Sequence, residues 1–229
     1  MFGNERHSQT VGQPDIDTKT KAIDKAVGFL DICLPLFPMY LKEYPSKSAK
    51  EKSLSRKLAT HLNDESRLRN NFFMIITEYD EPESERTDDF GFIKFKPYRN
   101  GEGDDAFFVM EAKRLPTPSK AREKEYVEGN LGGIERFKRG HHGASLTKSA
   151  MVAYVQKETY PHWLTKVNSW IQDLINTSTT ADIVWNSEDL LVFQTQFDTT
   201  FKYKSNNKRI HQGKTDDILL LHYWLPIND

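Results

Sequence analysis

Two runs of aromatic and β-branched residues on either side of a glycine-containing turn most constrain the fold of this chain. The first run, FGFIKFKPY, begins at Phe90, and the second, AFFVMEAKRL, ends at Leu115. Asn100, Gly101 and Gly103 lie between them. This pattern predicts two antiparallel strands joined by a turn. The hairpin would bring residues next to Phe90 alongside residues next to Leu115.

Three charged residues lie at the open end of this predicted hairpin. Glu111 and Lys113 follow the apolar run FFVM, and the alternation of a strand places both on one face, roughly 6.6 Å apart. Asp89 directly precedes the first run, so the hairpin brings it near residues 112 to 115, in a register that depends on the turn and on any bulge. Charges on a buried strand are costly unless they are paired or bind something. Two interpretations follow, an intrastrand pair of Glu111 with Lys113 or a site for a divalent cation.

A further acid, Glu51, occupies an unusual position on a predicted helix over residues 48–63. Glu51 shares one helical face with Leu54, Leu58 and Leu62, which should pack on the sheet. One interpretation is a carboxylate that the helix dipole favours at the first turn. The other is an additional acid directed at the charged cluster of the hairpin.

The remaining pattern predicts an α/β fold, with a central mixed sheet flanked by helices on both faces. Residues 1–18 are polar and without periodicity, which predicts a flexible leader. The chain from 19 to 229 is predicted to form a single domain, with a core at 48–138 and C-terminal helices and strands at 147–227. Helices are predicted at 19–44, with a kink at its prolines, at 119–138, and at 147–176 with an interruption at Pro161; strands are predicted at 72–77, 181–185, 190–197, 201–204 and 217–225.

Composition limits the classes of partner. Lys and Arg number 32 against 33 Asp and Glu, so a nucleic acid would have to bind through local basic patches and not through bulk charge. Cys33 is the single cysteine, which excludes internal disulfides and favours a reducing, cytoplasmic setting. No apolar run approaches the roughly 20 residues that cross a bilayer, and the first residues lack the apolar segment of a signal peptide. We therefore expect no membrane partner.

A basic segment lies at the end of the helix predicted at 119–138 and in the loop that follows. Its members are candidates for phosphate contacts, as is Arg114 beside the charged cluster, although cations also commonly compensate a helix C-terminus. The candidates for nucleic-acid contact are Arg114, Arg136, Lys138, Arg139 and His141. The pair His141–His142 does not predict a zinc site, because adjacent histidines point apart and no third ligand accompanies them at a useful spacing.

Taken together, these motifs resemble the PD-(D/E)XK nuclease superfamily, which has the restriction-endonuclease-like fold. The resemblance is carried by Glu51 with its leucines, by Thr87-Asp88-Asp89-Phe-Gly, and by Phe-Val-Met-Glu111-Ala-Lys113-Arg-Leu. The core order of that fold is helix, three strands, helix, strand, and residues 48–138 offer a similar order. Asp88 is the rival of Asp89, but Asp-Phe-Gly-Phe better fits an Asp followed by apolar residues. Thr87 stands where many members have proline.

The resemblance implies a metal-dependent endonuclease that hydrolyses phosphodiester bonds, with DNA favoured over RNA. It makes Asp89, Glu111 and Glu51 ligands of Mg²⁺ or Mn²⁺ and Lys113 the catalytic lysine. The segment YVEGNLGGIERFKRG is also similar to prokaryotic nuclease-like proteins of mobile-element and phage-defence settings. Two alternatives remain, an inactive nuclease-fold protein that binds nucleic acid or protein and a ribonuclease of the same fold. A homodimer or a partner subunit would complete the groove.

Overall fold

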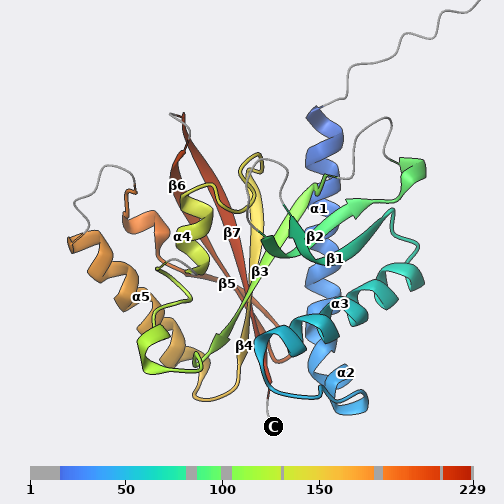
Figure 1. The fold of residues 1–229 in the computed structure, drawn as a ribbon, viewed down its shortest axis with the longest axis horizontal. Coiled ribbons are helices and arrows are strands. Elements are labelled where there is room, and N and C mark those ends of the chain that lie inside the picture. The colour runs from blue at the N-terminus through green and yellow to red at the C-terminus, as the bar shows by residue number, and fades with distance from the viewer. Residues whose placement is uncertain are drawn as a thin grey trace, which may run out of the picture.

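The computed structural model describes residues 16–80, 87–98, 105–129, 132–177, 183–211 and 214–227. These residues form an α/β fold around one seven-stranded sheet with the strand order β1-β2-β3-β4-β7-β6-β5 (Figure 1). The strands are β1 (Phe73–Asp80), β2 (Thr87–Lys94), β3 (Phe108–Leu115), β4 (Lys148–Val155), β5 (Val192–Phe197), β6 (Thr200–His211) and β7 (Lys214–Pro226). The α-helices are α1 (Ile16–Cys33), α2 (Phe37–Glu43), α3 (Glu51–Leu68), α4 (Gly133–Lys138) and α5 (Tyr160–Thr177).

The sheet is mixed, as predicted. Strand β2 is antiparallel to both of its neighbours, β1 and β3, and β6 is antiparallel to both of its neighbours, β5 and β7. Strand β4 lies between the two groups and pairs in parallel with both β3 and β7. The parallel centre is therefore formed by β3, β4 and β7, and β3 carries Glu111 and Lys113.

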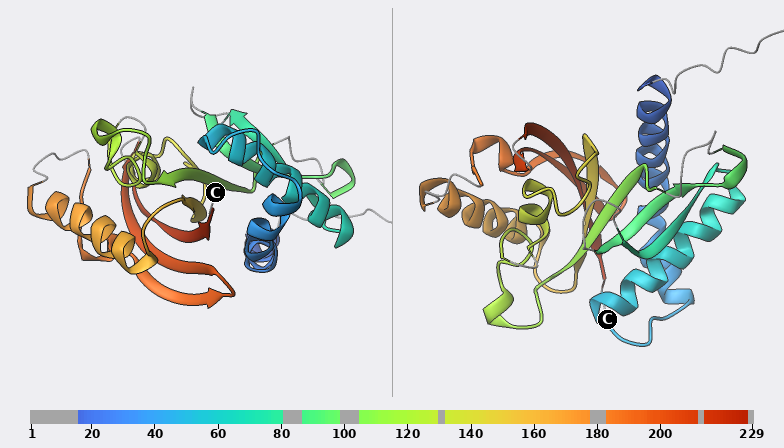
Figure 2. Two further views of the ribbon diagram at one scale, coloured as in Figure 1. Left: turned by 90° about the horizontal axis from the view of Figure 1, so that it is seen from below. Right: turned by 45° about the horizontal axis from the view of Figure 1, so that its top comes forward.

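Helices cover both faces of the sheet, which confirms the predicted layers. Helices α1, α2 and α3 lie on one face and α4 and α5 on the other (Figures 1 and 2). On β3, Phe108, Met110 and Ala112 belong to the core beneath α1 to α3, whereas Val109 and Leu115 belong to the core beneath α4 and α5. Because side chains alternate along a strand, Glu111 and Lys113 share the face that α4 covers.

Several sequence-based predictions of single elements are confirmed. The predicted hairpin is present as the antiparallel pair β2–β3, and its Gly-containing turn lies outside the described residues. The helix predicted at 48–63 is α3, and the strand at 72–77 is β1. The helix predicted at 19–44 divides at a 3₁₀ turn, Leu34–Leu36, which contains Pro35, a residue without the N–H that an α-helix needs.

Other predictions are wrong. The segment KSAMVAYV, predicted as helix, is the buried strand β4; a continuous apolar run of this length has no periodicity that separates a buried strand from a helix. The helix predicted at 119–138 is reduced to α4 and a short 3₁₀ turn, Lys120–Arg122. Ile183–Trp185 is not a strand, and residues 181–182 lie outside the description.

The predicted leader, residues 1–18, is described only in part. Residues 1–15 of the predicted leader lie outside the described residues, but α1 already begins at Ile16, so residues 16–18 belong to a helix. Within the described ranges, no helix combines the length and the apolar character needed to cross a membrane.

Candidate metal centre at the fork between two strands

The predicted charged residues lie where β2 and β3 separate. The two strands pair from Phe92↔Phe108 to Phe90↔Met110, and the ladder ends there. Beyond this point β2 continues beside β1, whereas β3 continues beside β4 as far as Leu115. A fork therefore opens between β2 and β3, and the edge of β3 that faces β2 has backbone N–H groups to satisfy.

Two side-chain carboxylates take the place of strand pairing in this fork. Asp89 Oδ2 accepts a hydrogen bond of 2.8 Å from the Ala112 N–H, and Glu51 Oε2 accepts one of 3.1 Å from the Arg114 N–H. Glu51 is the first residue of α3, so the N-terminus of that helix is directed at β3. Both predicted acids thus lie at the fork, and each uses one oxygen for the backbone of β3.

Glu111 and Lys113 form a buried ion pair at the centre of the fork. The Lys113 Nζ lies 2.5 Å from Glu111 Oε1, and the two residues are 4% and 1% exposed. Arg136, from α4, places its Nη1 at 3.2 Å from the same oxygen. One oxygen of the Glu111 carboxylate therefore faces two cations, and this pairing makes the burial of these charges tolerable.

The charges fix the protonation states of this pair. Burial raises the pKa of Glu111, but the charges of Lys113, His142 and Arg136 outweigh burial and lower it to about 2. Burial lowers the pKa of Lys113, but the charges of Glu111, Asp89 and Glu51 outweigh it and leave the pKa above its usual value. Both groups are therefore ionised at neutral pH.

The other oxygen of Glu111 belongs to a second group of residues. His142 Nε2 lies 3.3 Å from Glu111 Oε2, and His142 Nδ1 contacts Asp88 Oδ1. All three residues are buried, and each offers one ligand atom within 4.8 Å of the others. Within the described part of the chain, Glu111 Oε2 and both ring nitrogens of His142 have no hydrogen-bond partner. Such buried orphan atoms fit the donor set of a divalent ion.

The chain places His142 through a tight end of α4. Gly140 adopts φ 65°, and the Gly140 and His141 N–H groups donate to the carbonyl oxygens of Phe137 and Arg136 at 3.0 and 2.8 Å. This is the pattern of a Schellman motif, in which a glycine in the left-handed region ends the helix. The loop that follows is held from the sheet, because Arg209 Nη1 donates to the Gly143 carbonyl at 2.8 Å.

Two further pKa shifts describe what this centre can bind. Burial lowers the pKa of His142 to about 3, so its ring is neutral at pH 7 and one nitrogen carries a lone pair. Burial and the charge of Glu111 raise the pKa of Asp89 to about 7. The negative charge of Glu111 therefore opposes ionisation of the nearby Asp89 carboxyl. A bound cation would relieve the repulsion between the two carboxylates.

The structure brings together the four predicted site residues and adds two others. Asp89, Glu111, Lys113 and Glu51 all contact β3 or belong to it at the fork. The buried group of three, however, contains Asp88 and not Asp89. The sequence offers no third ligand at a useful spacing from the two adjacent histidines, but the fold places Asp88 of β2 and Glu111 of β3 beside His142. No spacing along the chain signals that contact.

One residue predicted to contact nucleic acid is enclosed in the fold. The Lys138 side chain is fully buried, pairs with Asp189 at 2.6 Å, and lies over the Trp185 ring at 4.8 Å from its centroid. In this structure the Lys138 ammonium is not presented to solvent. Lys138 instead joins α4 to the segment before β5.

The other predicted contacts remain partly accessible. Arg114, Arg136, Arg139 and His141 are all half-buried. Arg136 already pairs with Glu111, and the Arg114 Nη1 donates to the Ala49 carbonyl at 3.1 Å. Arg114, on β3, is therefore held beside the start of α3, and Arg136 reaches the fork from α4.

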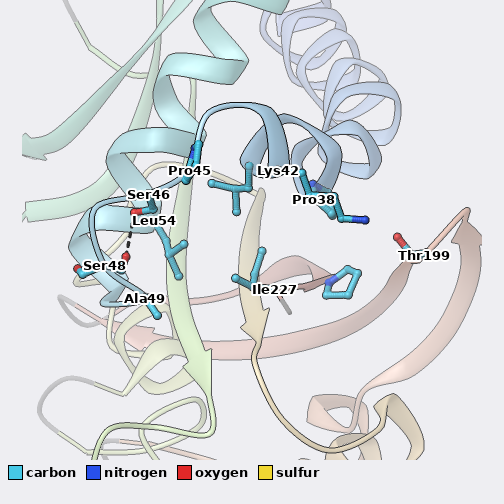
Figure 3. A pocket seen from close by; sticks show the side chains of 11 residues that line it. Pro38, Lys42, Pro45, Ser46, Ser48, Ala49, Leu54, Thr199 and Ile227 are labelled. Carbon is cyan, nitrogen blue, oxygen red and sulfur yellow. Dashed lines mark hydrogen bonds between the residues drawn. The ribbon is translucent and has the colours of Figure 1, made fainter. Parts of the chain in front are cut away.

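A cavity of about 470 Å³ lies elsewhere, between α2, the start of α3 and the end of β7. Figure 3 shows apolar walls from Pro38, Leu54 and Ile227, with polar side chains such as Lys42 at its border. Among the described residues that line it there is no carboxylate. This cavity is therefore not the candidate metal centre, although Ala49, which lines it, bonds Arg114.

No family model, curated protein or solved structure matches this chain. Function must therefore be inferred from the chemistry of the site. Carboxylates, an imidazole, a buried ammonium and a guanidinium can together hold a divalent cation and stabilise negative charge on a bound anion.

Proposed function

We propose that this protein is a metal-dependent nuclease of the PD-(D/E)XK type that hydrolyses phosphodiester bonds, with DNA as the favoured substrate. The observation that carries the proposal is the buried Glu111–Lys113 pair at the β2–β3 fork, with Asp89 and Glu51 beside it. A buried ion pair often contributes no more stability than apolar residues of the same size. A binding role accounts for this costly arrangement better than a structural one.

The order of the elements supports the same proposal. The nuclease fold that the sequence resembles has the order helix, three strands, helix, strand, and α3, β1, β2, β3, α4 and β4 follow that order. Strands β1 to β3 are antiparallel and β4 is parallel to β3. The charged residues lie on the second and third of these strands. Strands β5 to β7 extend the sheet beyond this unit.

The proposed roles follow from the chemistry of each side chain. Asp89, Glu111 and Glu51 are the carboxylates proposed to hold Mg²⁺ or Mn²⁺, which, when bound, neutralises phosphate charge and lowers the pKa of water. The Lys113 ammonium, which stays charged, stabilises negative charge that develops on the phosphate oxygens. Arg114 and Arg136 hold the phosphate backbone near the fork.

A second candidate function is a nuclease-fold protein that binds nucleic acid or a partner protein and does not cleave. The burial of the central pair favours it, because Glu111 is 1% and Lys113 is 4% exposed. Cleavage requires that a phosphate reach this pair, and therefore that the fork open when substrate binds. A binding protein has no such requirement.

Cleavage assays separate the two functions. Plasmid DNA, single-stranded DNA and RNA are incubated with the chelator-treated protein, with Mg²⁺, Mn²⁺ or EDTA added. We expect metal-dependent cleavage that falls at least about 100-fold in Lys113→Met and is unchanged in Lys157→Met, which alters an exposed lysine. Circular dichroism verifies that each variant is folded. Absence of cleavage of all three substrates by metal-loaded wild type would refute the nuclease and favour the binding protein.

A further inference from the structure

We propose that Asp88, Glu111 and His142 form a site for a first-row transition-metal ion, on the side of Glu111 that faces away from Lys113. The ion is bound by two carboxylates and one imidazole, and the imidazole selects it over Mg²⁺. The inference rests on the proposed function only for what the ion is used for. Binding of the ion is tested by measurements that involve no cleavage.

The three side chains are already close to the geometry of a metal site. Their ligand atoms lie within 4.8 Å of one another. Ligand atoms around one ion, at metal–ligand distances near 2.1 Å, are roughly 3 to 4.4 Å apart. The observed spread exceeds this range by only a few tenths of an ångström.

The polar atoms of this group point to a missing positive charge. Glu111 Oε2 and the two ring nitrogens of His142 are buried and have no hydrogen-bond partner among the described residues. A carboxylate oxygen faces each nitrogen of the His142 ring, although neither ring nitrogen forms a hydrogen bond with a described residue. A divalent ion among these atoms would coordinate the imidazole and both carboxylates.

Neighbouring residues hold the ligands in place and leave the binding side open. Lys113 and Arg136 both contact Oε1 of Glu111, so the orientation of the carboxylate is held while Oε2 remains available. The His142 ring packs on Phe137, with 5.4 Å between the ring centroids. Supporting contacts of this kind commonly orient metal ligands.

The donor set determines the class of ion. Mg²⁺ strongly prefers oxygen ligands and retains several waters, whereas imidazole suits Zn²⁺ and neighbouring transition metals. Affinity for a site of mixed nitrogen and oxygen ligands rises from Mn²⁺ to Co²⁺. We therefore expect Co²⁺ and Zn²⁺ to bind more tightly than Mn²⁺, and Mn²⁺ more tightly than Mg²⁺.

Calorimetric titration of the chelator-treated protein at pH 7 tests the site, with Mg²⁺, Mn²⁺, Co²⁺ and Zn²⁺ as probes. We expect wild type to bind Co²⁺ at least about tenfold more tightly than Mg²⁺. His142→Asn should weaken Co²⁺ binding at least about tenfold, because loss of a residue that only supports a metal ligand already costs that much, and should change Mg²⁺ binding little. His162→Asn, which alters an exposed histidine, should behave as wild type. Equal Co²⁺ affinity in wild type and His142→Asn overturns the proposal, as does absence of Co²⁺ binding by wild type.

A second measurement avoids any variant that fails to fold. Pulsed electron paramagnetic resonance of Mn²⁺-loaded wild type should detect hyperfine coupling to an imidazole ¹⁴N nucleus, and its absence overturns the proposal. A wild-type protein that shows this coupling but cleaves no nucleic acid would refute the nuclease alone. Cleavage by a protein without nitrogen coordination would refute the His142 site alone.

Discussion

His142 Nε2 lies 3.3 Å from Glu111 Oε2, although one residue belongs to the loop after α4 and the other to the middle of β3. This contact divides the Glu111 carboxylate between two environments. Oε1 faces the cations Lys113 and Arg136, whereas Oε2 faces an imidazole and, beyond it, Asp88. Glu111 is therefore the residue on which both the proposed hydrolysis and the proposed transition-metal site depend.

The two adjacent acids of β2 should differ in their effect on metal binding. Saturating Co²⁺ should raise the Tm of wild type, because an ion that binds only the folded state adds about 2.7 kcal/mol at 100 times its Kd. Asp88→Asn should remove most of this increase and Asp89→Asn should retain it. Of these two acids, Asp88 contacts His142, whereas Asp89 accepts a hydrogen bond from the Ala112 N–H. Differential scanning fluorimetry with Co²⁺ or EDTA measures the effect, and a larger loss in Asp89→Asn would contradict it.

The Glu111–Lys113 pair should show strong coupling in unfolding experiments. Glu111→Leu leaves the buried Lys113 without its closest partner, and Lys113→Met does the same to Glu111, so each should destabilise by about 3–5 kcal/mol. The double variant should cost clearly less than the sum, because it leaves neither charge behind. Urea denaturation of the four proteins without metal measures this coupling. Additive effects would show that the two charges do not interact.

The free energy of unfolding should decrease as the pH is lowered, because the buried His222 binds a proton only in the unfolded chain. Burial lowers the pKa of His222 to about 3, and the ring contacts Tyr126 and Ser205 at 2.9 Å each. The unfolded chain binds a proton near pH 6.5 and the folded one does not, so the contribution of His222 is complete above pH 6.5 and is lost as pH falls toward 3. The slope is about 1.4 kcal/mol per pH unit for this group.

Comparison with His222→Gln isolates this contribution from those of other histidines. Urea denaturation between pH 7 and pH 4 should give a smaller loss of stability for His222→Gln than for wild type. Identical slopes for the two proteins would mean that His222 binds a proton equally well in the folded and unfolded states.

Gly91 should tolerate no larger side chain. A Cβ atom at this position of β2 would lie 2.6 Å from Cγ of Tyr79, on the neighbouring strand β1. Gly91→Ala must therefore displace a buried ring, and we expect a loss of about 1–3 kcal/mol. Urea denaturation measures it. Tyr79→Ala is itself destabilising because the ring is buried, but in that background Gly91→Ala should cost clearly less than in wild type. An equal cost in both backgrounds would place the clash elsewhere.

Local patterns were sufficient for part of this structure. The alternation of a strand put Glu111 and Lys113 on one face, and the leucine stripe put Glu51 on the inner face of α3. These relationships involve residues a few positions apart, so the geometry of a single strand or helix dictates them. The hairpin β2–β3 was predictable from two strand-like runs around a turn, and the mixed sheet flanked by helices from the order of the predicted elements.

Long-range contacts decided the rest. KSAMVAYV became β4 and not a helix because β3 and β7 pair with it on both sides. The place where β2 leaves β3 sets which of Asp88 and Asp89 joins the buried group, and a hairpin sequence leaves that register open. His142 reaches Glu111 only because α4 packs on β3 and its C-terminal glycine turns the loop inward. Such contacts depend on how separate elements pack, and no periodicity in the chain encodes them.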